Sequence, residues 1–141
     1  MLVRLLYASR AVGDSQNAVI HDIMQQSHAH NPGNGITGVL CYSDKVYMQV
    51  LEGGRAAINA LYAKILRDAR HTDVVLLHYE EIAERRFSCW TMGQANLAKL
   101  NTSTLLRFSE IPEINPHAMS GKHSLALIDE LMATATVVGR A

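Results

Sequence analysis

Residues 36–54 constrain the fold more than any other segment, because they contain two short apolar runs separated by a three-residue polar turn. Residues 36–42 and 46–52 each have the length and composition of a β-strand, and Ser43-Asp44-Lys45 joins them. Two glycines, at positions 53 and 54, follow the second run. This arrangement predicts a β-hairpin, so the rest of the chain must supply the elements that cover a sheet.

Helical patterns flank the hairpin on both sides. Upstream, residues 3–8 alternate as a short strand, and apolar residues from 19 onward recur at helical spacing. We expect this first helix to begin at a cap on Asp14 or Ser15, to run to about His30 and to end at the breaker cluster 31–35. Downstream, apolar residues from 58 to 66 follow the i, i+3, i+4, i+7 spacing of a second amphipathic helix.

Two further strands, at 74–79 and 87–95, complete the order β-α-β-β-α-β-β. This order is the split β-α-β arrangement of ferredoxin-like folds with one extra strand. The predicted class is therefore α+β, with both long helices on one face of the sheet.

The chain changes character from about Asn101. Pro112 and Pro116 divide it into a short helix and a longer one with an apolar stripe. The second, uncovered face of the sheet is the expected place for this stripe. We therefore divide the chain into a first unit, residues 1–96, and a C-terminal helical extension, residues 97–141.

The composition excludes several classes of protein. Of the 141 residues, 13 are Lys or Arg and 13 are Asp or Glu, so the chain lacks the basic excess of a nucleic-acid binder. No apolar stretch approaches the ~18 residues that cross a bilayer, and Arg4 interrupts the N-terminus too early for a signal peptide. Cys41 and Cys89 are expected to be small buried thiols in a cytoplasmic protein. The histidines lack the spacing of a metal site.

Gln49 is unusual because it lies inside the apolar run 46–51. Period-two alternation places it on one strand face with Tyr47 and Leu51, where its amide must find partners or cost about 1–3 kcal/mol. Tyr7 lies on the first strand, which neighbours the third in a ferredoxin-like order, and its hydroxyl also needs a partner if buried. The two side chains are expected to meet if both point to the helix side. From the pattern alone, an ordinary buried Tyr–Gln hydrogen bond is a sufficient explanation.

Five short blocks of the sequence form a set. They are Arg4–Ser9 (RLLYAS), Asn31–Leu40 (NPGNGITGVL), Gln49–Gly53 (QVLEG), Asp68–His71 (DARH) and Arg86–Met92 (RFSCWTM). In this order and at this spacing, over about residues 2–95, the set resembles the BLUF family, sensors of blue light using FAD. One block alone would be a weak signal, but five in order are hard to obtain by chance.

The resemblance implies that residues 1–96 are a photosensory domain with a flavin ring between the two long helices. Tyr7 matches the family's photoactive tyrosine, and Gln49 matches the glutamine that switches between Tyr7 and the polar edge of the ring. Asn31 matches the asparagine that hydrogen-bonds this edge. Further contacts with the ring and ribityl chain are implied for Ser27, His30, Lys64, Asp68, His71 and Met92.

The resemblance also implies how a signal leaves the domain. Trp90 and Met92 resemble the family's Trp/Met pair, which lies on the fifth strand beside the first and relays the change at Gln49 toward the C-terminal helices. For Trp90, a plain core or interface anchor is the alternative.

The implied cofactor is FAD, although FMN or riboflavin would fit the same ring pocket. We expect no enzymatic activity, no metal, no nucleic acid and no membrane. No second catalytic motif follows the resemblance, so output is expected to act in trans on a partner protein. The uncovered sheet face and apolar stripe also predict a homo-oligomer.

Two other functions stay open at this point. An acylphosphatase-like hydrolase would need an Arg-bearing phosphate loop after the first strand, and residues 9–13 are a poor match for one. A light-insensitive binding or oligomerisation module with the same fold is disfavoured by the presence of both Tyr7 and Gln49. A yellow protein with a reversible spectral shift under blue light would distinguish a photoreceptor from both.

Overall fold

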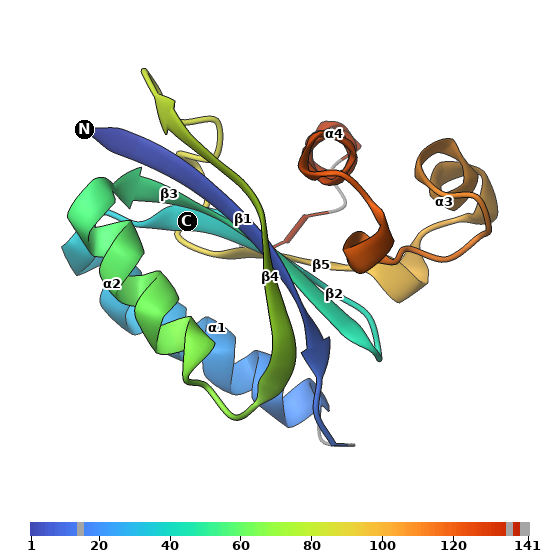
Figure 1. The fold of residues 1–141 in the computed structure, drawn as a ribbon, viewed down its shortest axis with the longest axis horizontal. Coiled ribbons are helices and arrows are strands. Elements are labelled where there is room, and N and C mark those ends of the chain that lie inside the picture. The colour runs from blue at the N-terminus through green and yellow to red at the C-terminus, as the bar shows by residue number, and fades with distance from the viewer. Residues whose placement is uncertain (14–15, 135–136, 139–141) are drawn as a thin grey trace.

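The computed structural model describes residues 1–13, 16–134 and 137–138, and a five-stranded sheet forms the centre of this part of the chain (Figure 1). The strands are β1 (Leu2–Ala11), β2 (Thr37–Tyr42), β3 (Val46–Gly54), β4 (His71–Ile82) and β5 (Gly93–Asn96). They lie in the order β4-β1-β3-β2-β5, and all neighbours are antiparallel except the parallel pair β2 and β5. The predicted hairpin is β2 with β3, and the α+β, ferredoxin-like class is confirmed.

Helices cover both faces of this sheet. α1 (Gln16–Asn34) and α2 (Arg55–Leu66) lie on one face, and α4 (Gly121–Ala133) lies on the opposite one (Figure 1). The short helix α3 (Thr102–Phe108) and two 3-10 turns, η1 (Leu97–Lys99) and η2 (Pro116–Ala118), connect β5 to α4. The side chain of Ser120 caps α4 by accepting the backbone N–H of His123.

The first helix ends later than predicted. α1 continues to Asn34 with Pro32 inside it, and the residue that stops it is Gly35, whose φ is +66°. Gly35 N–H donates to the Pro32 carbonyl at 3.3 Å and Ile36 N–H to the Asn31 carbonyl at 3.0 Å, the pair of bonds of a Schellman cap. Only glycine adopts this left-handed conformation without strain. The cap predicted at Asp14 or Ser15 lies outside the described residues.

Alternation along β1 and β3 sends their side chains into two separate cores. The core between the sheet and the long helices includes Val3, Leu5, Ile20, Met24, Leu51 and Ile58. The core under α4 includes Leu6, Met48, Val50, Leu127, Ile128 and Leu131, all fully buried. The second sheet face was therefore correctly predicted as the place for the C-terminal helix. Because α4 already covers this face within the chain, the argument for a homo-oligomer loses its basis.

The fifth strand differs from its prediction in both length and neighbour. It begins only at Gly93 and pairs with β2, not with β1. Residues 83–92, which we call the β4–β5 loop, turn instead of extending, because Trp90 N–H binds the Phe87 carbonyl at 3.1 Å. Trp90 and Met92 therefore lie in this loop and not on a strand face beside β1.

Two smaller predictions also differ. β4 is longer than 74–79 because β1 pairs with it from Leu2, opposite Ile82, to Ala11, opposite His71. Cys41 is buried as predicted, but Cys89 is exposed because it lies in the β4–β5 loop.

Candidate functional site

A cavity of about 440 Å³ lies between α1, α2 and the sheet face that they cover. Its volume is in the usual range for small-molecule sites, about 300–1,000 Å³. The apolar part of its wall comes from helices and strands alike and includes Ile23, Ile36, Leu40, Ala57, Leu61 and Ile65. A few polar side chains converge on the same space, which is the usual composition of a ligand pocket.

Tyr7 and Gln49 are directly opposed in the β1–β3 ladder. The Tyr7 hydroxyl donates to Gln49 Oε1 at 2.5 Å, and Gln49 Nε2 donates to the Met92 sulfur at 3.3 Å. Tyr7 is 4% exposed, Gln49 5% and Met92 0%. All three line the cavity, so a chain of hydrogen bonds runs along its wall from a phenol through an amide to a thioether.

Burial fixes the protonation state of Tyr7. It raises the pKa of the phenol far above its ordinary value, and the carboxylate of Asp68 raises it further. Tyr7 is therefore a hydrogen-bond donor at neutral pH, and Gln49 turns its oxygen toward it. A thioether only accepts, so Met92 favours the same orientation of the amide, with Nε2 facing the sulfur.

The α1 wall of the cavity carries Ser27, His30 and Asn31. Asn31 is 4% exposed, and its Nδ2 donates to the Thr91 carbonyl at 3.2 Å. The last turn of α1 is therefore tied to the β4–β5 loop immediately before Met92.

Charged groups gather where α2 and the start of β4 meet the cavity. Hydrogen bonds from Arg70, whose Nη2 is 2.5 Å from Asp68 Oδ2, lower the pKa of Asp68 although its partial burial opposes this. His71 Nε2 is 2.8 Å from the Ile65 carbonyl, and His71 Nδ1 is 2.7 Å from Ser9 Oγ. Because a carbonyl only accepts, Nε2 carries a proton, and in the neutral ring Nδ1 is then the acceptor of the Ser9 hydroxyl.

The cavity brings together the residues that the sequence singled out for the cofactor. It is lined by Tyr7, Ser27, His30, Asn31, Gln49, Lys64, Asp68, His71 and Met92. Trp90 does not line it, and its carbonyl instead accepts the Gly38 N–H at 2.8 Å. The sequence analysis missed Tyr47 and Arg70 on the wall. Both could have been identified from the sequence, since Tyr47 shares the strand face of Gln49 and Arg70 lies within the DARH block.

Other chemistries find less support in the structure. Within residues 1–13, 16–134 and 137–138, no group of three or more His, Cys, Asp and Glu side chains could hold a metal ion. The same residues contain no helix long and apolar enough to cross a membrane. Residues 9–13 do not form a hydrolase phosphate loop, since β1 itself extends to Ala11 and Arg10 is paired with Asp73 at 2.9 Å.

Comparison with known sequences identifies relatives of this chain. The family described as sensors of blue-light using FAD (BLUF) matches residues 2–93. The photoactivated adenylate cyclase subunit beta of Euglena longa is 37% identical over 102 residues, which are 72% of this chain and 12% of that protein. The blue light- and temperature-regulated antirepressor BluF of Escherichia coli (strain K12) is 29% identical over 62% of this chain and 22% of that protein. This chain therefore spans only a small part of the length of these relatives.

Solved structures with the same fold are similar over nearly the whole chain. The photo-activated state of BlsA has a TM-score of 0.83 at 31% identity, covering 94% of this chain and 95% of that one. The dark-state structure of the BLUF protein BlrB has a TM-score of 0.77 at 30% identity, covering 95% and 96%. These matches cover almost the whole of this chain. Together with the family match over residues 2–93, they show that this chain belongs to the BLUF family of blue-light sensors.

Proposed function

We propose that this chain is a blue-light photoreceptor, which holds a flavin in the cavity between α1 and α2 and signals by rearranging the Tyr7–Gln49 hydrogen bond. The observation that carries this proposal is the position of the Tyr7–Gln49–Met92 chain, which is buried and yet borders a cavity. A purely structural Tyr–Gln pair needs no ligand-sized space beside it. A photoactive pair needs one, because its partner is the chromophore.

The cavity suits a flat aromatic ring with one polar edge. Apolar side chains from both helices, such as Ile23 and Leu61, offer surfaces for the faces of the ring. The amides of Asn31 and Gln49, both nearly fully buried, offer donors and acceptors for the polar edge. Each amide can form further hydrogen bonds beyond those to Tyr7, Met92 and Thr91, so two of them on one cavity wall favour a polar ligand.

FAD is the cofactor that we propose, because the family is defined by it. Lys64 lines the cavity and supplies positive charge that suits the phosphates of FAD or FMN, whereas the charge of Arg70 on the same wall is paired with Asp68. Riboflavin would have to bind through ring and ribityl contacts alone. Flavin released from the purified protein by denaturation and separated by chromatography identifies the bound form.

The chemistry of Tyr7 and Gln49 follows from their hydrogen bond. A bound flavin would supply the absorption of blue light and, in its excited state, an acceptor for an electron from Tyr7. Loss of an electron makes the Tyr7 hydroxyl strongly acidic, so its proton leaves along the 2.5 Å bond to Gln49. The Gln49 amide then turns or tautomerises, which exchanges its donor and acceptor ends without leaving the site.

The rearranged state persists after the electron and proton have returned to Tyr7. The return of Gln49 to its first orientation would require breaking its bond to Tyr7, in a place where both side chains are nearly fully buried. A buried hydrogen-bond network with two satisfied arrangements is bistable for this reason. With a flavin bound, the turned Gln49 amide would offer it a different hydrogen bond, which is expected to shift the absorption band slightly to longer wavelength.

Met92 is the residue that reads the orientation of Gln49, because its sulfur accepts a hydrogen bond in one orientation only. We propose that the change passes through the β4–β5 loop, including Trp90, to the C-terminal helices. The chain then acts in trans on a partner protein and has no enzymatic activity of its own. The relatives named as cyclases are far longer, since the matched segment is 12% of their length.

Absorption spectroscopy of the purified protein tests this proposal. The protein is expected to be yellow, and its flavin bands should shift reversibly under blue light. A colourless protein that cannot be loaded with flavin would contradict the proposal.

A further inference from the structure

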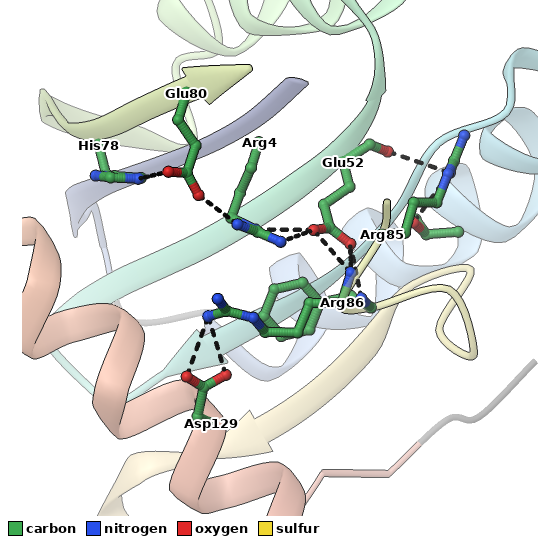
Figure 2. Close-up of polar contacts among 9 residues, drawn as sticks. Arg4, Glu52, His78, Glu80, Arg85, Arg86 and Asp129 are labelled. Carbon is green, nitrogen blue, oxygen red and sulfur yellow. Dashed lines mark hydrogen bonds and ion pairs between the residues drawn. The ribbon is translucent and has the colours of Figure 1, made fainter. Parts of the chain in front are cut away.

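The backbone of the β4–β5 loop, which carries Met92 to the cavity, is bound on the far side of the sheet by a buried carboxylate. Glu52 is fully buried, and its Oε1 accepts the backbone N–H of Arg86 at 3.0 Å and that of Phe87 at 2.7 Å. Figure 2 shows both bonds converging on the Glu52 carboxylate from the loop. Two consecutive amides bound to one side chain fix the direction in which the loop leaves this point.

Arg4 neutralises this buried carboxylate. Its Nε and Nη2 lie 2.8 Å and 2.7 Å from Glu52 Oε2, and its Nη1 pairs with Glu80 (Figure 2). The Arg4 guanidinium also lies over the ring of Phe87, 5.9 Å from its centre. Both oxygens of Glu52 and both sides of the Arg4 guanidinium are therefore engaged, as a buried ion pair requires.

Glu52 lies three residues after Gln49 on the same strand, so their side chains point to opposite faces of the sheet. The Gln49 amide therefore faces the cavity, and the Glu52 carboxylate, which binds the loop, faces α4. The loop then passes the edge of the sheet, where the Trp90 carbonyl accepts from Gly38, and reaches the cavity with Met92. The loop that carries Met92 to Gln49 is accordingly attached at two points, to β3 through Glu52 and to β2 through Gly38.

The geometry points to Glu52 as a positioning residue of the photoactive site: paired with Arg4, it holds the β4–β5 loop so that the Met92 sulfur meets Gln49. This role rests on the function proposed above and deepens it. It concerns a side chain that does not line the cavity, and it acts through backbone bonds to the loop. If the bonds from Glu52 to the loop are lost, the Met92 sulfur is no longer held in position beside Gln49.

Arg86 offers a matched control, because its backbone and its side chain serve different contacts. Its N–H binds Glu52, whereas its guanidinium binds Asp129 of α4 at 3.1 Å (Figure 2). Asp129→Asn therefore weakens the tie between the loop and α4 but leaves the bonds to Glu52 in place.

The experiment compares the full-length, flavin-loaded protein with three variants. Glu52→Gln removes the charge that faces Arg4, and Arg4→Met with Glu52→Leu removes both charges without leaving one unpaired in the core. Asp129→Asn is the control. The readouts are the [13C]methyl NMR signal of Met92, assigned by its loss in Met92→Leu, and the rate of dark recovery after blue light.

Both Glu52 variants are expected to bind flavin, to shift or broaden the Met92 signal and to change the recovery rate by about tenfold. Asp129→Asn should behave as wild type in both readouts. A double variant with flavin bound, an unchanged Met92 signal and unchanged recovery would overturn the inference. A wild-type protein without a light response would refute the proposed function. The role of Glu52 in positioning Met92 would still be tested, because the NMR signal of Met92 can be measured without a photocycle.

Hydrogen exchange of the wild-type protein covers the case in which neither Glu52 variant folds. The amides of Arg86 and Phe87 should exchange as slowly as those of β3, because Glu52 holds them in a buried site. Exchange as fast as that of residues 83 and 84 would overturn the inference.

Discussion

Gln94 of β5 and Val138 exchange both of their backbone hydrogen bonds, with N···O distances of 2.8 and 2.9 Å. This bridge places residues 137 and 138, which we call the C-terminal segment, at the edge of the sheet beside Gln94, two residues beyond Met92. Val137 is buried there at 5% exposure. A change in the β4–β5 loop therefore has an immediate neighbour in the C-terminal segment, as well as in α4.

Gly93→Val is predicted to displace this segment. A Cβ at Gly93 would lie 2.6 Å from Val137 Cγ1 and 3.0 Å from Trp90 Cε3, so one of the two must move. We expect the Gln94 and Val138 amides to lose their protection from hydrogen exchange by about tenfold or more, while flavin stays bound.

Gly33→Ala is the matched control for this variant. Gly33 lies in α1 with no atom within 4 Å of an added Cβ, so the substitution should leave the two amides protected and stabilise the helix slightly, by about 0.5–1 kcal/mol. Unchanged exchange at Gln94 and Val138 in Gly93→Val would show that the bridge does not depend on this packing.

Met92→Leu is predicted to alter the light response more than the stability. The substitution conserves volume in a fully buried site, so the free energy of unfolding should fall by less than about 1.5 kcal/mol. It removes the sulfur that accepts from Gln49 Nε2, and with it the preference for one orientation of the amide. The expected result is a flavin-bound protein with a changed dark-recovery rate, measured by absorbance after a blue-light pulse. Wild-type recovery would mean that Met92 does not sense Gln49.

Cys41 is predicted to contribute to alkaline instability. Burial raises the pKa of its thiol from 9.0 to about 12. Between these values the unfolded chain loses the thiol proton and the folded chain keeps it, so the free energy of unfolding falls as pH rises, by up to about 1.4 kcal/mol per pH unit. Cys41→Ala removes this contribution. Urea unfolding at about pH 8 and about pH 11 should therefore show a smaller loss for Cys41→Ala than for wild type, and equal losses would contradict the assignment.

The contact between Tyr7 and Gln49 could be predicted from the sequence because it depends on two local rules. Period-two alternation gives the face of each side chain, and the split β-α-β order makes their strands neighbours. The structure adds the register, in which the two residues are directly opposed.

The fifth strand could not be predicted because its start depends on a distant side chain. The pattern at 87–92 is compatible with a strand, but the N–H of Phe87 binds Glu52, which is 35 residues away in sequence. The Arg4–Glu52 pair was missed for a similar reason, since two charges in separate apolar strands show no local sign of pairing. The predicted end of α1, at the start of the breaker cluster 31–35, was too early because the helix continues through Pro32, and within this cluster it is Gly35 that supplies the positive φ of the cap.

The light-minus-dark absorption spectrum of Tyr7→Phe tests the central claim most directly. The phenylalanine keeps the ring in the cavity wall and removes the hydroxyl, which leaves Gln49 Oε1 without this donor at a cost of about 1–2 kcal/mol in stability. Cys41→Ala, on the opposite sheet face, is the control and should shift like wild type. The account predicts that Tyr7→Phe binds flavin and shows no reversible shift under blue light. A reversible shift of wild-type size in Tyr7→Phe would contradict it.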